Sequence, residues 1–87
     1  MIESLDGWES VDELALALSL EGRMFASEGN LEDAEKQLRR AIACDTYCLL
    51  AYEWLEYVLD AQERFDEACE VRESKRRAVL ERALIIE

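Results

Sequence analysis

The sequence contains no proline and no histidine, and glycine occurs at only three of its 87 positions. Proline and glycine are the residues that most often interrupt helices, so their scarcity favours a few long helices over many short strands. Histidine is the side chain most often used for proton transfer near neutral pH, and its absence removes the commonest general acid or base. The sequence therefore predicts an all-α chain that is not an enzyme.

Cysteine is also scarce and occurs only at Cys44, Cys48 and Cys69. An odd number of cysteines without histidine fits neither a disulfide framework nor a structural zinc site, which usually has four Cys or His ligands. We therefore expect three buried free thiols. The scattered glycines form no phosphate-binding loop, and the acids lack the spacing of a calcium loop. No catalytic residue, metal site or cofactor is predicted.

Basic residues are few, with 10 Lys and Arg against 21 Asp and Glu, which gives a net charge of −11. Nucleic-acid binding needs a positive track, so we expect no nucleic-acid partner. No leader with a basic start and an apolar centre begins the sequence, and no apolar run approaches the roughly 20 residues of a membrane span. We accordingly expect no membrane contact and a cytoplasmic location.

The sequence resembles itself at an offset of 34 positions: segment 16–18 aligns with 50–52, and segment 31–34 aligns with 65–68. A fixed period of this size is typical of stacked copies of one supersecondary unit. Each copy has the pattern of two helices. The predicted helices are near 11–28, 31–44, 47–62 and 66–86.

Local signals support these boundaries. Ser10 and Glu13 fit a capping box, which predicts that the first helix begins after Ser10. Asn30 and Asp45 are the predicted N-caps of the second and third helices. Val11, Leu14, Leu18 and Phe25 share one face of the first helix, and the predicted buried stripe of the second helix is Ala34, Leu38, Ala41 and Ile42.

Small and large apolar residues recur in an order that carries a family resemblance. The first copy has Leu18, Gly22, Phe25, Ala34, Leu38 and Ala41, and the second has Tyr52, Leu55, Leu59 and Ala68. The chain resembles the tetratricopeptide repeat family over about residues 15–75, although Glu56 replaces the close-packing glycine of the second copy. The resemblance implies antiparallel helix pairs in an α-α superhelix. A weaker similarity, over residues 45–80, is to the helical domain of bacterial transcriptional activators.

The length of 87 residues fits one domain over residues 1–87, which we expect to be tetratricopeptide-like. Repeat one covers about 15–48, the degenerate repeat two covers about 49–75, and a C-terminal helix extension covers 76–87. In this family the first helix of each repeat lines a concave groove that binds a peptide or helix of another protein. The corresponding residues are Leu16, Ser19, Arg23, Ala26, Leu50, Glu53, Tyr57 and Asp60. The alternatives are that these residues form only a wetter helical side, that the chain is an assembly subunit, or that it is a regulatory domain of a transcription activator.

The second copy departs from the pattern in its last helix. Arg72, Lys75 and Arg76 stand where the first copy has Leu38, Ala41 and Ile42. Unpaired charges are costly in a core, so this helix either leaves the domain after position 69 or meets acids there. Apolar residues return at Val79, Leu80, Ala83 and Ile86. They fit either a capping helix that folds back, or a homo-oligomer in which the three bases face Glu9, Asp12 or Glu13 of another chain.

Overall fold

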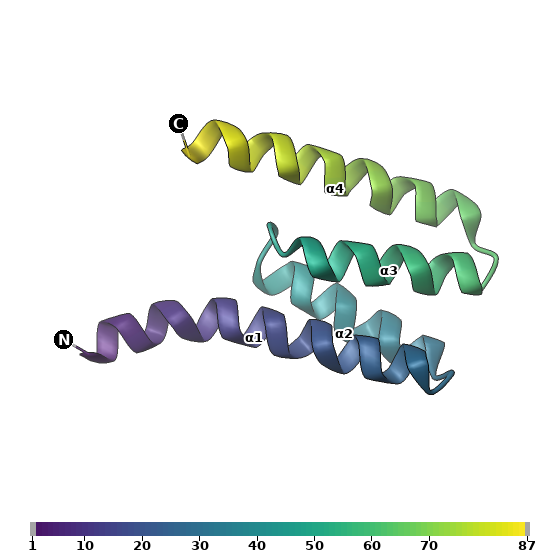
Figure 1. Ribbon diagram of the computed structural model, residues 1–87, viewed down its shortest axis with the longest axis horizontal. Coiled ribbons are helices and arrows are strands. Elements are labelled where there is room, and N and C mark those ends of the chain that lie inside the picture. The colour runs from purple at the N-terminus through teal and green to yellow at the C-terminus, as the bar shows by residue number, and fades with distance from the viewer. Residues whose placement is uncertain (1, 87) are drawn as a thin grey trace.

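A computed structural model describes the backbone of residues 2–86 and the side chains of residues 13–84. It contains four helices, α1 (Ile2–Ser27), α2 (Leu31–Cys44), α3 (Leu49–Ala61) and α4 (Phe65–Ile86), and residues 2–86 include no strand. Each helix runs back against the previous one, as Figure 1 shows. The molecule is flat, with extents of 47 × 29 × 14 Å. The all-α prediction is confirmed.

The helices pack as two successive hairpins. α1 packs against α2 and α3 packs against α4, while α2 and α1 both also contact α3. Within the described part of the chain, the backbone of α4 comes close to no helix other than α3. The fully buried side chains of Leu38, Leu55, Val58 and Leu59 lie in the shared apolar core. The second hairpin is therefore held to the first mainly through α3.

The turns within the two hairpins have the same backbone geometry, 34 residues apart. Gly29 has a φ of 87° and Glu63 has a φ of 62°, both in the left-handed region. The N–H of Asn30 donates to the carbonyl of Phe25 at 2.8 Å, and the N–H of Arg64 donates to the carbonyl of Leu59 at 2.9 Å. The 34-residue period of the sequence thus corresponds to a repeated helix–turn–helix backbone.

Two predicted helix caps are wrong. α1 begins at Ile2, so Ser10 lies inside this helix instead of before it. Segment 2–10 lacks proline, and a helix tolerates its one glycine, Gly7, at a cost of about 1 kcal/mol. Asp45 caps the C-terminal end of α2, where its Oδ1 accepts the N–H of Tyr47 at 3.0 Å, and Cys48 is the residue that precedes α3.

The predicted close approach of the first two helices is present at Gly22. A Cβ atom placed on Gly22 would lie 2.5 Å from Cγ of Leu38 and 3.3 Å from the carbonyl oxygen of Ala34. Ala34, Leu38 and Ala41 are buried as predicted, and Ile42 is half-buried. On α1, Leu18 is buried and Phe25 is half-buried, whereas Leu14, which helical spacing assigns to the same face, is exposed. The α1–α2 contact thus depends on a residue without a side chain.

Candidate functional site

Two of the eight predicted groove residues, Ser19 and Ala26, are buried. The Ser19 hydroxyl donates to the carbonyl of Ala15 at 2.8 Å and lies 3.4 Å from Sγ of Cys48 at the start of α3. Ser19 is buried where α1 meets the start of α3, and burial keeps both side chains away from any partner. The 3–4 spacing used in the prediction joined two neighbouring faces of α1, of which only one reaches solvent.

The other six predicted residues offer surface on α1 and α3. Leu16 is 48% exposed and Tyr57 is 54% exposed, while Leu50 is half-exposed. The charged members, Arg23, Glu53 and Asp60, are all exposed. The ring of Tyr57 stands edge-on to Trp54, with centroids 5.4 Å apart, and this contact restrains its position. The six residues, named the groove face below, combine apolar and charged side chains.

Equivalent residues of α1 and α3 differ in exposure because the two helices have different neighbours. Glu53 and Asp60 follow Ser19 and Ala26 by 34 positions, so the two pairs occupy the same side of their helices. On α1 this side is covered by the second hairpin, whereas on α3 no described element covers it. Small residues occupy the covered positions and acids occupy the open ones.

The bases of α4 meet acids of α3 in the same chain. Arg72 Nε donates to Glu56 Oε2 at 2.8 Å, and Lys75 Nζ lies 3.6 Å from Glu53 Oε2. The hydrogen bond to Glu56 raises the pKa of the Arg72 guanidinium. Of the two outcomes expected for α4, pairing with acids is therefore the one found. Of the expected acids in another chain, Glu9 and Asp12 lie outside the described side chains.

A second ion cluster joins α2 to the turn before α4. Arg64 lies 2.7 Å from Glu35 and 2.6 Å from Glu67, and Arg39 lies 2.9 Å from Glu35. Hydrogen bonds from Arg64 lower the pKa of the Glu35 and Glu67 carboxyls. The sequence alone does not reveal this cluster, because Glu35 and Arg64 are 29 residues apart. Its contacts link the two hairpins, which indicates a structural role.

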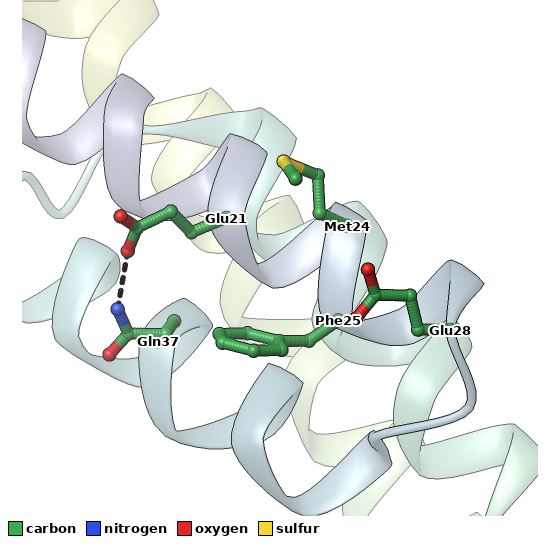
Figure 2. A pocket seen from close by; sticks show the side chains of 5 residues that line it. All are labelled: Glu21, Met24, Phe25, Glu28 and Gln37. Carbon is green, nitrogen blue, oxygen red and sulfur yellow. Dashed lines mark hydrogen bonds between the residues drawn. The ribbon is translucent and has the colours of Figure 1, made fainter.

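Figure 2 shows a pocket of about 400 Å³ between α1 and α2. It is lined by Glu21, Met24, Phe25, Glu28 and Gln37, and Phe25 points between the two helices. Gln37 donates a hydrogen bond to Glu21 at one end of the pocket, and Glu28 lies at the other end, past Met24 and Phe25. The pocket suits an apolar side chain that also carries, or lies beside, a positive charge.

The described residues contain no arrangement that would hold a metal ion. No group of three or more His, Cys, Asp or Glu side chains converges among them. The three thiols are free. Cys44 and Cys69 are exposed, so the prediction of burial is wrong for these two, and Cys48 is half-buried. In residues 2–86, no helix has the length and apolar character needed to cross a membrane.

The last turns of α4 leave their apolar side chains in solvent. Among the described side chains Ala78 is the last buried one, and Val79, Leu80, Ala83 and Leu84 are exposed. The capping interpretation, in which these side chains fold back on the domain, is therefore wrong for them. Ile86, the last residue of the predicted self-association set, lies outside the described side chains. Self-association through this segment stays a prediction.

Comparison of the chain with protein-family models, curated proteins and solved structures finds no match. The structure thus defines the class as an all-α chain of two stacked helical hairpins. Because a fold alone does not assign a function, the function must be argued from the surfaces described above.

Proposed function

We propose that the chain is a non-catalytic interaction module of the tetratricopeptide type. Its groove face binds a peptide or helix of another protein. The observation that carries this proposal is the exposure of Leu16 on α1 and of Tyr57 on α3, two helices that contact each other. Tyrosine and other aromatic residues supply much of the binding energy in protein interfaces, and a tyrosine already restrained by Trp54 loses less entropy on binding.

The charges of the groove face indicate the chemistry of the bound segment. Glu53 and Asp60 are exposed on α3, the helix of Tyr57, and Arg23 is exposed on α1, the helix of Leu16. Lys75 is 3.6 Å from Glu53, so this acid is partly neutralised, whereas Asp60 has no ion pair within the described side chains. The favoured partner is therefore a segment with one or two large apolar side chains and a base positioned for Asp60.

Two features support the family assignment within this proposal. The hairpin turns recur at 34 residues with matching hydrogen bonds, and 34 is the period of tetratricopeptide repeats. In addition, Gly22 packs directly against Leu38, as the close-packing glycine of the resemblance would. The second hairpin lacks this glycine, so the resemblance remains strongest in the first hairpin.

A peptide-display selection on the full chain tests the proposal. Peptides selected on the unmodified chain are then measured against Tyr57→Ala and Leu16→Glu. We expect each change to weaken binding at least tenfold, about 1.4 kcal/mol. Phe65→Ala is the matched control, because Phe65 is as exposed as Tyr57 but lies at the start of α4, and its binding should be unchanged. Selected peptides that bind both groove variants normally would contradict the proposal.

A further inference from the structure

The internal repeat shows which surface of α1 resembles a covered interface. On α3, the side that faces the first hairpin contains Ala51, Leu55 and Val58, which are almost completely buried. The equivalent residues of α1, 34 positions earlier, are Ala17, Glu21 and Met24, and all three are exposed. No described element covers this side of α1. It therefore corresponds to a helix-packing surface that has no helix on it in the single chain.

This surface, named the α1 edge, is formed by Leu20, Glu21, Met24 and Glu28. Leu20 and Met24 are one helical turn apart and are 40% and 60% exposed. Glu21 and Glu28 flank them and also line the pocket in Figure 2. The α1 edge therefore presents two large apolar side chains between two carboxylates.

A second surface has the opposite charge. It is formed by Arg76, Arg77, Leu80 and Leu84 near the end of α4 and is named the α4 edge. Leu80 and Leu84 are also one turn apart, and they are 60% and 73% exposed. Arg76 and Arg77 are exposed, and within the described side chains neither forms an ion pair. Two large apolar side chains thus lie one turn beyond two free bases.

Neither edge suits a copy of itself. Two α1 edges brought together would place four carboxylates beside one apolar contact, and two α4 edges would place four bases there. Like charges that are partly desolvated at an interface oppose association, whereas opposite charges guide it and fix its register. Of the other large apolar side chains of α3 and α4 that are exposed, Tyr57 and Phe65 stand alone, and Val79, at 42%, adjoins the α4 edge.

We propose that the α4 edge of one copy binds the α1 edge of the next copy, so that the chain associates head to tail. An antiparallel contact packs Leu80 on Met24 and Leu84 on Leu20, which brings the two arginines next to Glu28 and leaves Glu21 to attract them from about two turns away. α1 and α4 lie along opposite borders of the flat molecule, with α2 and α3 between them (Figure 1). One pair of copies therefore cannot form both contacts, and the association continues beyond two chains. This contact is separate from the groove face and does not depend on the proposed function.

Charge reversal tests the contact without changing a buried residue. Light scattering is measured on the full chain over a range of concentrations, for the unmodified chain and for Glu21→Lys with Glu28→Lys, Arg76→Glu with Arg77→Glu, and all four changes together. We expect the mass of the unmodified chain to rise from 10.1 kDa past twice that value without a plateau. Each double change should hold the mass at 10.1 kDa, and the fourfold change should restore association because it exchanges the two charges.

The control is Glu63→Lys with Glu70→Lys, which changes the net charge as much as the α1-edge variant does but at exposed positions outside both edges. It should associate like the unmodified chain, and helical dichroism should be the same for all variants. A constant mass of 10.1 kDa for the unmodified chain up to high micromolar concentration would overturn the proposal. A plateau at two chains that only the α4-edge variant dissociates would also overturn it, in favour of pairing between two α4 helices. So would a fourfold variant that stays monomeric.

Discussion

The two hairpins share a backbone turn but use different contacts between their helices. In the first hairpin Gly22 faces Leu38, which is fully buried. In the second, the equivalent positions hold Glu56 and Arg72, joined by a hydrogen bond of 2.8 Å. The environment accounts for the difference, because Leu38 belongs to the core at the junction with α3 whereas the side chain of Arg72 is half-exposed. One helical register can therefore be filled by close apolar packing or by an ion pair.

Because of this difference, the contact at Leu38 in the first hairpin should stabilise the fold more than the contact at Arg72 in the second. Burying a leucine contributes about 1.5–3 kcal/mol, whereas a surface ion pair contributes about 0–1 kcal/mol.

The polar contact of the second hairpin also affects whether another helix can pack on it. The outer side of α3 and α4 is closed by Arg72 and Lys75 with their acids, so a further helix would have to break those pairs to pack there. The stack of helices thus has ion pairs at this side and exposed apolar side chains at the α1 edge.

The largest predicted effect is at Gly22. Gly22→Leu places a large side chain where even a Cβ would lie 2.5 Å from Cγ of Leu38 and 3.3 Å from the carbonyl oxygen of Ala34, so the packing of α1 on α2 must change. We expect the free energy of unfolding to fall by about 1–3 kcal/mol or more. Thermal unfolding followed by helical dichroism measures this change.

The matched control is Glu56→Leu, which introduces the same residue at the equivalent position of the second hairpin. It removes one half-exposed ion pair and adds an apolar side chain, so the loss should stay below about 1 kcal/mol. Equal losses in the two variants would show that the two hairpins pack their helices equally tightly at these positions.

A smaller effect, dependent on pH, is expected where the hairpins are joined by Glu35. Hydrogen bonds from Arg64 lower the pKa of this carboxyl in the folded chain. A lowered folded pKa stabilises the fold above the unfolded pKa, and that contribution is lost as the pH falls through the folded pKa. Glu35→Gln should therefore be less stable than the unmodified chain at neutral pH, by less than about 1 kcal/mol, and equally stable in acid.

Urea unfolding at a series of pH values measures this difference. Glu32→Gln, a change at an exposed acid of the same helix, serves as the control and should give a smaller difference at every pH. If the gap between Glu35→Gln and the unmodified chain stayed constant as the pH was lowered, the ion cluster would not be its cause.

The fold was largely predictable from the sequence because it depends on local periodicity. The period of 34 and the spacing of Ala34, Leu38 and Ala41 identified the helices and the close contact at Gly22, and both are confirmed. The start of α1 was missed because Ser10 satisfies a capping pattern, yet nothing before it opposes a helix. A capping pattern permits a boundary, but it does not require one.

The candidate site was less predictable because it depends on which helix covers which face. Helical spacing alone could not show that Ser19 is covered by the second hairpin while its equivalent, Glu53, remains exposed. One signal was available in the sequence. Gly22 and Leu38 both change to charged residues of opposite sign, Glu56 and Arg72, and such a paired change indicates contact between the two positions.

The smallest effect concerns the turns of the two hairpins. Gly29 and Glu63 both have left-handed backbones, but only the glycine adopts this conformation without a steric penalty. The penalty is about 1–2 kcal/mol for other residues, and glycine offsets about half of the gain because it makes the unfolded chain more flexible. Glu63→Gly should therefore stabilise the chain by about 0.5 kcal/mol, measured as a higher urea midpoint.

Two variants serve as controls. Glu63→Ala keeps the steric penalty and should change the midpoint little. Gly29→Glu should destabilise the first hairpin through backbone strain alone, because no atom lies within 4 Å of its Cβ position. A lower midpoint for Glu63→Gly would show that flexibility of the unfolded chain outweighs strain in the second turn.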